Sequence, residues 1–405
     1  MSLRRSLLLP VILLGLLHAY IGWRVLPDLP VGFEVRIAGA VFLLFSCGLM
    51  LLGLMGGSIR PRSLSDRVAA AALFTAGLFS SLLVFTVLRD VVLLAAWLPL
   101  SAQHLQVLES ASAVLVVGLT VFATVVGFAN ARRRARIKRV EIPLRNLPQA
   151  LNGFSIAQIS DVHVGPTIKR GYVDAIVDAV NELDADLIAV TGDLVDGPVP
   201  DLAPHTEPLA RLSARHGAFF VTGNHEYYSG ERAWTAEFKR LGLRVLLNEH
   251  VVVMHRGAPV VIAGVTDYSS HHFNAAQRSD PAAALAGAPS NAGAKILLAH
   301  QPRSAAAAAT AGFDLQLSGH THGGQFWPWT LFVRFQQPFT AGLHRLNSLW
   351  VYISRGTGYW GPPKRFGAPS EITLLRLVPA RPTDAPGAPR SDYHCSMPRP
   401  ISALQ

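Results

Sequence analysis

The stretch Phe154-Ser-Ile-Ala-Gln-Ile-Ser-Asp161-Val-His163 passes from an apolar segment directly into two polar side chains, Asp161 and His163. Short apolar segments that end at Gly or Asp are typical of buried β-strands. Four later segments repeat this arrangement: 187–190 before Gly192-Asp193, 218–221 before Gly223-Asn224-His225-Glu226, 296–298 before His300, and 315–317 before Gly319-His320-Thr321-His322. Loops at strand ends meet at one edge of a sheet in open α/β folds, so we expect these polar side chains to converge.

Helical stretches alternate with these strand-like segments. Residues 171–183, for example, carry Val173, Ile176, Val177 and Val180 at helical spacing. Further strand-like runs lie at 251–254, 260–265, 349–353 and 372–377. This alternation predicts an α/β domain over residues 153–379. Residues 380–405 are rich in Pro, Ala, Ser and Arg, and we expect them to be disordered.

Residues 1–130 are strongly apolar, which predicts an all-α transmembrane domain. Each of four apolar stretches is close to the roughly 20 residues that cross a bilayer core; they are 7–23, 37–54, 68–88 and 111–128. The run 91–100 is too short to span alone and is interpreted as an interfacial or re-entrant piece; if it is a span, the topology inverts. Residues 131–152, where basic residues give way to Pro143 and Pro148, are predicted to be a linker.

The positive charge of the chain lies in its membrane part. Residues 1–140 contain 14 Lys and Arg against 5 Asp and Glu, so they hold nearly all of the formal net charge of +10. No nucleic-acid binding is therefore expected. With four helices, one side of the membrane receives the basic run 132–139, which also suits anionic lipid headgroups. The positive-inside rule makes that side cytoplasmic and places the α/β domain there.

The polar side chains at the strand ends form a mixed set of nitrogen and oxygen ligands. Two divalent cations about 3.5–4 Å apart need a bridging ligand, which a carboxylate can provide. Imidazole-rich sets suit Mn²⁺, Fe²⁺ or Zn²⁺ better than Mg²⁺. The two cysteines, Cys47 and Cys395, offer no Cys-type zinc site. The candidate metal ligands are Asp161, His163, Asp193, Asn224, His300, His320 and His322.

The ordered series Asp-x-His, Gly-Asp, Gly-Asn-His-Glu, His and Gly-His-x-His resembles the calcineurin-like metallophosphoesterases, in particular the bacterial membrane-anchored subfamily. The resemblance covers residues 156–377 and implies a sandwich of two β-sheets flanked by helices. It implies that a hydroxide bridging the metals attacks phosphorus and that His225 assists the leaving group. By motif, one metal takes Asp161, His163 and His322, the other takes Asn224, His300 and His320, and Asp193 bridges them.

His225 follows Asn224 in a tight turn, so we expect it beside the metals whether or not it binds them. A nearby carboxylate would keep it protonated as a general acid, and Asp196 is the candidate. The alternative for Asp196 is a solvated loop residue. Gly197 stands where phosphoprotein phosphatases of this superfamily carry an Arg, which argues against a Ser/Thr phosphoprotein phosphatase.

The leading hypothesis is a membrane-anchored phosphohydrolase with two divalent metals that acts on a phosphoester or phosphoanhydride. Its membrane tether favours a lipid-linked substrate over other phosphorylated small molecules. A pyrophosphatase of lipid A synthesis acting on UDP-2,3-diacylglucosamine is the specific alternative, and the expected location is the cell inner membrane. A membrane sensor or transporter with a regulatory soluble domain is the hypothesis of another class. Apart from His18, the predicted spans carry almost no ionisable side chain in their interiors, which argues against a transporter.

Overall fold

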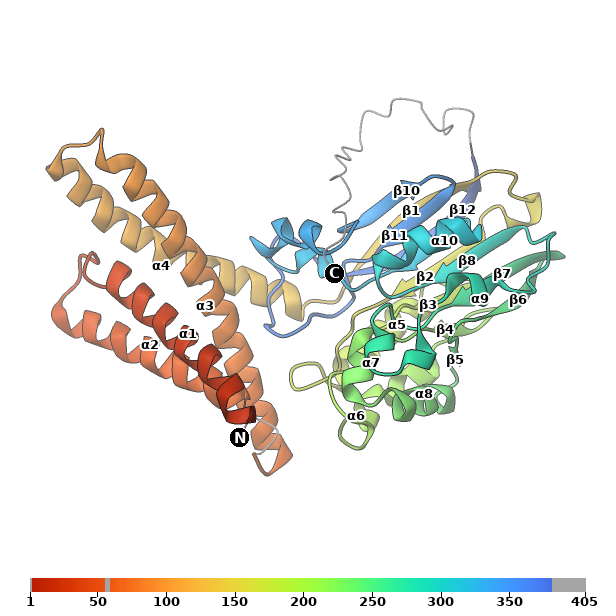
Figure 1. Cartoon of the computed structure of the whole chain (residues 1–405), viewed down its shortest axis with the longest axis horizontal. Helices are drawn as coiled ribbons and strands as arrows, with labels where there is room; N and C mark the ends of the chain where they lie inside the picture. The colour runs from red at the N-terminus through yellow and green to blue at the C-terminus, as the bar shows by residue number, and fades with distance from the viewer. Residues whose placement is uncertain (1, 55–58, 381–405) are drawn as a thin grey trace.

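The computed structural model describes residues 2–54 and 59–380, which form a helical part and a part built on two β-sheets (Figure 1). Of the segment predicted to be disordered, residues 381–405 lie outside the described residues. The helical part comes first along the chain and leads directly into the first sheet (Figure 1).

Each predicted apolar stretch of the membrane part lies within one long helix. Among the described residues, α2, α3 and α4 are long and apolar enough to cross a membrane, whereas the apolar part of α1, Leu9–Val25, is shorter. The run 91–100 is not a separate piece as predicted, because most of it continues α3 to Trp97. The helices are α1 (Ser2–Val25), α2 (Phe33–Leu54), α3 (Arg62–Trp97) and α4 (Ala102–Arg132).

Some buried polar side chains in the helical part have polar partners on other segments. His18 Nε2 lies 3.0 Å from Ser46 Oγ, between α1 and α2. Arg89, almost fully buried in α3, pairs with Asp28 and donates to the Arg24 carbonyl across 2.6 Å. Large apolar side chains such as Leu44 and Phe122 are exposed instead, as expected for helices that face lipid.

The second part is a sandwich of two six-stranded sheets. The first sheet has the order β1-β12-β2-β3-β4-β5 and the second β10-β11-β9-β8-β7-β6. Apolar side chains of both sheets, among them Phe219 and Leu298, form one buried layer between them. The strands are β1 (Arg136–Leu144), β2 (Ser155–Ile159), β3 (Leu187–Val190), β4 (Ala218–Phe220), β5 (Arg244–Val245), β6 (Glu249–His255), β7 (Ala258–Gly264), β8 (Ala294–Leu298), β9 (Leu315–Ser318), β10 (Gly342–Leu346), β11 (Leu349–Ile353) and β12 (Glu371–Pro379).

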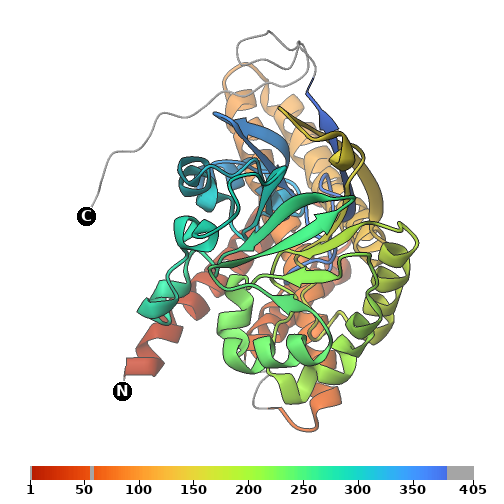
Figure 2. The same ribbon diagram turned by 90° about the vertical axis from the view of Figure 1, so that its right-hand side faces the viewer.

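Helices cover the outer faces of both sheets (Figures 1 and 2). Val173 of α5 and Trp234 of α8 pack on the first sheet, and Ala284 of α9 and Ala308 of α10 pack on the second. The predicted two-sheet sandwich flanked by helices is therefore confirmed. These helices are α5 (Arg170–Asn181), α6 (Val199–Thr206), α7 (Asn224–Ser229), α8 (Glu231–Arg240), α9 (Pro281–Leu285) and α10 (Ala305–Ala311).

The prediction of a linker over residues 131–152 is wrong. Residues 136–144 form β1, which pairs in parallel with β12 along its whole length. The run is basic at its start, but Val140, Ile142 and Leu144 occupy alternate positions of a strand, separated by Glu141 and Pro143, and the last two are buried. Only a few residues separate α4 from the sheet, so the membrane helices are joined to the sandwich through regular structure.

Candidate metal centre

The loops that follow β2 and β3 lie side by side. Asp161 N–H donates to the Gly192 carbonyl across 3.0 Å, and His163 N–H donates to the Asp193 carbonyl across 3.1 Å. Gly192 has φ +85°, and a Cβ there would lie 2.6 Å from the Gly223 nitrogen. Only glycine therefore allows the loop after β4 to approach this closely.

Left-handed backbone is concentrated at the candidate ligands. A positive φ is uncommon for a residue other than glycine and costs of the order of 1–3 kcal/mol in strain when it is held in place. Such strain clusters at functional sites. Five of the seven candidates have it: Asp161 (54°), His163 (56°), Asp193 (54°), His320 (71°) and His322 (51°).

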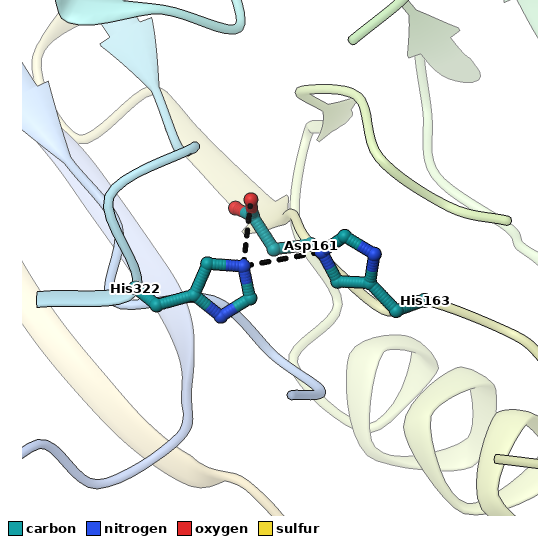
Figure 3. Close-up of side chains that lie close together, drawn as sticks. All are labelled: Asp161, His163 and His322. Carbon is teal, nitrogen blue, oxygen red and sulfur yellow. Dashed lines mark hydrogen bonds and ion pairs between the residues drawn. The ribbon is translucent and has the colours of Figure 1, made fainter. Parts of the chain in front are cut away.

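Asp161, His163 and His322 form one cluster of ligand atoms (Figure 3). His322 Nε2 lies 3.1 Å from His163 Nε2 and 3.4 Å from Asp161 Oδ1. The three side chains come from two distant segments, the loop after β2 and the loop after β9, and point toward one another (Figure 3).

Asp193, His300 and His320 form a second cluster. His300 Nε2 lies 3.1 Å from Asp193 Oδ2 and 3.2 Å from His320 Nδ1. Asp193 Oδ2 is also 3.9 Å from His163 Nε2, which belongs to the first cluster. The carboxylate of Asp193 therefore faces both clusters, where a bridging ligand would be needed.

Asn224 supplies a buried oxygen without a protein partner. Its Oδ1 makes no hydrogen bond, although buried polar atoms nearly always do. Asn224 lies close to Asp193, because the backbone N–H of the next residue, His225, donates to Asp193 Oδ1 across 2.9 Å. An amide oxygen left free beside carboxylates and imidazoles fits a metal ligand.

The orientation of the histidines also fits bound cations. His300 Nδ1 donates to the Thr191 carbonyl across 2.7 Å, so its Nε2 is left to act as a ligand. His163 Nδ1 likewise donates to Asp196 Oδ1 across 3.0 Å. Two imidazole nitrogens about 2.0–2.1 Å from one zinc ion at a tetrahedral angle would be roughly 3.3 Å apart. The observed separations of 3.1 and 3.2 Å between ligand nitrogens are close to that value.

His225 lies beside both clusters and is held by Asp196. Its Nδ1 is 2.6 Å from Asp196 Oδ1, and its Nε2 is 4.0 Å from Asp193 Oδ2. Burial lowers the pKa of His225, but the carboxylates of Asp196 and Asp193 outweigh it and raise that pKa to about 9. Asp196 is thus not the solvated loop residue of the alternative interpretation, since one of its oxygens accepts from two imidazoles.

The other imidazoles differ in their affinity for protons. Burial lowers the pKa of His320 and of His322 to about 4, so both are neutral near pH 7. Burial also acts against a charge on His300, but the Asp193 carboxylate raises the pKa of His300 well above its ordinary value. His300 therefore holds a proton that a cation would have to displace.

Two residues at the centre were not predicted as site residues. The buried carboxylate of Glu226 accepts from the N–H groups of Asp193 (3.0 Å), Leu194 (2.8 Å) and Gly223 (2.6 Å), and so joins two ligand loops. Its position three residues after a helix N-cap is a signal that could have revealed this. The fully buried Arg365 donates to the His322 carbonyl across 3.1 Å, and no local motif marks it.

Comparison with known proteins places the same residues in a family context. Residues 154–324 match the calcineurin-like phosphoesterase family. A transmembrane protein with a metallophosphoesterase domain from Danio rerio is 37% identical over 275 residues, which cover 66% of this chain and 63% of that protein. The chain thus spans less than two thirds of this relative's length.

Bacterial proteins are similar to this chain as well. An uncharacterized metallophosphoesterase from Helicobacter pylori is 38% identical over 256 residues, which cover 62% of this chain and 66% of that protein. One from Aquifex aeolicus is 31% identical over 247 residues, which cover 60% of this chain and 91% of that protein.

Proposed function

Because this chain belongs to the calcineurin-like phosphoesterase family, we propose that it hydrolyses a phosphoester or phosphoanhydride bond with the help of two divalent cations. The observation that carries this proposal is the position of Asp193. Its Oδ2 lies 3.1 Å from His300 Nε2 in one cluster and 3.9 Å from His163 Nε2 in the other. A carboxylate between two sets of imidazoles is the arrangement that a pair of cations requires.

Each cation would have its own ligands. Asp161, His163 and His322 would hold one, Asn224, His300 and His320 the other, and Asp193 both. The four imidazoles favour manganese, iron or zinc over magnesium. When bound, the cations would neutralise charge on the phosphoryl oxygens and lower the pKa of a coordinated water, which supplies a nucleophile near neutral pH.

His225 would donate the proton that the leaving group needs. Asp196 accepts a hydrogen bond from Nδ1 of His225 and keeps the ring protonated. The proton on Nε2 then faces the two clusters. A positioned acid of this kind contributes about 10²- to 10⁴-fold to the rate. Asp196 would orient both this acid and the ligand His163, because its Oδ1 accepts from both rings.

We propose that the substrate is lipid-linked. Trp360 is 54% exposed, and its ring centroid lies 5.6 Å from that of His225. Tyr228, also exposed, lies on His225 as well, with centroids 5.2 Å apart. Exposed aromatic side chains beside a phosphate site suit a substrate that carries an apolar group. The pyrophosphate of a UDP-linked acylated sugar is one substrate of this class.

The helices would fix the enzyme as a multi-pass protein of the inner membrane, with the sandwich in the cytoplasm. The basic residues that end α4 and begin β1 support this side. A transporter or sensor is less well supported, because His18 and Arg89, buried among the helices, both have protein partners there.

A hydrolysis screen tests the proposal. The full chain in detergent, loaded with Mn²⁺ or Zn²⁺, would be given bis-p-nitrophenyl phosphate, p-nitrophenyl phosphate and a UDP-linked acylated sugar. Metal-dependent turnover of at least one is expected, and the UDP-linked compound distinguishes a lipid-linked substrate from a soluble one. Absence of turnover on every compound at saturating metal would contradict the proposal.

A further inference from the structure

An aromatic segment, residues 329–335, projects from the sandwich next to the membrane helices. It consists of two 3₁₀ turns, Trp329–Leu331 and Val333–Phe335, and follows the loop of the ligands His320 and His322. Trp329, Leu331, Phe332 and Phe335 are all exposed, and Phe335 is 72% exposed. Four large apolar side chains within seven residues are more than scattered surface residues, so a partner for them is expected.

The aromatic segment touches α3 directly. Trp329 Nε1 donates to Ser80 Oγ across 3.0 Å, and the ring of Trp327 stacks on that of Phe85 with centroids 5.7 Å apart. The loop 360–367 lies against α4, the helix that follows α3, since Arg365 N–H donates to the Gly127 carbonyl of α4 across 2.8 Å. Two backbone hydrogen bonds join the two loops: Trp327 N–H donates to the Phe366 carbonyl across 2.9 Å, and Phe366 N–H donates to the Gln325 carbonyl across 3.2 Å.

Lys364 stabilises the contact between the loop 360–367 and the two helices. It is 2% exposed, and its ammonium donates to the Gly77 carbonyl (2.9 Å), Ser81 Oγ (2.6 Å) and Thr124 Oγ1 (3.2 Å). All three acceptors belong to α3 or α4. The sandwich is therefore held against the sides of these helices as well as joined to the end of α4.

The contacted residues lie in the uncharged stretches of the two helices. In α3 no charged residue occurs between Arg67 and Arg89, which is 21 residues or roughly 31 Å of helix and close to the thickness of a bilayer core. Ser80 and Phe85 are both inside this stretch, and Gly127 lies in the uncharged part of α4 before Arg132. Whatever membrane surrounds these stretches must also meet the loops packed on them.

We propose that the aromatic segment inserts into the bilayer, with lipid acyl chains as the partner of its apolar side chains. The backbone suits such a place, because Leu331, Phe332, Phe335 and Gln336 all donate to carbonyls within the segment or just before it. The guanidinium of Arg334, 5.2 Å from the Phe335 ring centroid, is a cation that a lipid phosphate could pair with.

Insertion would keep the metal centre close to the bilayer. The loop 360–367, joined to the aromatic segment, carries Trp360 beside His225 and Arg365 beside His322. A lipid phosphate would then reach the centre without leaving the membrane. This consequence rests on the proposed function, whereas the insertion itself does not.

Quenching by lipid tests the insertion in the full chain. In a background with Cys47→Ala and Cys395→Ser, single cysteines would carry an environment-sensitive fluorophore at Phe335→Cys, at Leu44→Cys in α2 and at Met254→Cys in β6. All three parent side chains are exposed. The labelled proteins would be reconstituted into phosphatidylcholine and phosphatidylglycerol vesicles that contain lipid brominated on its acyl chains, and monodispersity in detergent would show that each is folded.

The proposal predicts that brominated lipid quenches the label at 335 as it does at 44, and leaves the label at 254 unchanged. Aqueous iodide should show the opposite order. If the label at 335 behaves like the one at 254, the insertion is wrong. If the label at 335 is shielded from iodide only at high protein density and brominated lipid does not quench it, a second copy covers the segment and the proposal is also overturned. No readout depends on hydrolysis, so a failed substrate screen would leave this result standing.

Discussion

Asp196 Oδ1 lies 2.6 Å from His225 Nδ1, and this contact connects the predicted acid to the candidate metal ligands. The same oxygen accepts from His163 Nδ1 at 3.0 Å. One carboxylate therefore orients the ring of the candidate ligand His163 and favours the charged form of the neighbouring ring of His225. Burial would raise the pKa of Asp196, but the two imidazoles more than offset this and hold it below its ordinary value.

Replacement of Asp196 should change the pH profile more than the metal content. Asp196→Asn keeps an acceptor near His225 but removes the charge that raises the pKa of His225 to about 9. The acid would lose its proton at lower pH, so the alkaline limb of kcat should move down by about one pH unit, equivalent to about 1.4 kcal/mol of charge interaction. Profiles of kcat against pH for both proteins measure this, and an unmoved limb would remove Asp196 from its proposed role.

His225→Ala should lower kcat by about 10²- to 10⁴-fold and leave the bound metal in place. The reason is that Nε2 of His225 is 4.0 Å from Asp193 Oδ2, beside the ligands, while Asp196 holds its other nitrogen. Elemental analysis and single-turnover rates give the two readouts. His272→Ala, at an exposed position of the 3₁₀ turn Ser270–His272, is the control and should leave both unchanged. Loss of a metal from His225→Ala would instead make His225 a ligand.

Metal binding should release protons and weaken as the pH falls. His320 and His322, with pKa values of about 4, are already neutral near pH 7. His300 is not, because Asp193 raises its pKa well above the ordinary value, so a cation must displace its proton. Calorimetric titration of the metal-free protein in two buffers of different ionisation enthalpy measures the release. Equal heats in both buffers and an affinity independent of pH would contradict a protonated His300 in the metal-free protein.

Lys364→Met should loosen the sandwich from the membrane helices. The substitution keeps the apolar stem but removes the donor to Gly77, Ser81 and Thr124, at a cost of about 1–3 kcal/mol. The thermal midpoint in detergent should fall. Lys239→Met, at an exposed position of α8, is the matched control and should have little effect. An equal midpoint for both variants would mean that Lys364 does not stabilise this contact.

Much of the fold and of the candidate metal centre could be predicted from the sequence, because the relevant signals are local. Each ligand segment combines a short apolar run with a polar residue directly after it, and the strands β2, β3, β4, β8 and β9 lie at those runs. Parallel pairing of β2 with β3 and of β8 with β9 then brings their ends together.

The features that could not be predicted from the sequence depend on contacts between distant residues. The run 136–144 is basic, and its strand character becomes decisive only when β12, more than 200 residues later, is available to pair with it. Arg365 has no motif of its own, since its function as a donor to His322 exists only after two loops have met. The end of α3 was mistaken for a separate piece because Arg89 and Asp90 interrupt an apolar run, whereas in the structure Asp28 and Arg24 pair with them.

The most direct test of the central claim is the metal content and turnover of Asp193→Asn. The asparagine keeps the shape of the side chain and an oxygen for the His225 N–H, but it removes the charge that faces both clusters. We predict two metal ions per chain in the parent protein, fewer in the variant at equal free metal, and nearly abolished hydrolysis with an unchanged fold. Two ions in the variant together with more than about a tenth of the parent activity at saturating metal would contradict a two-metal site bridged by Asp193.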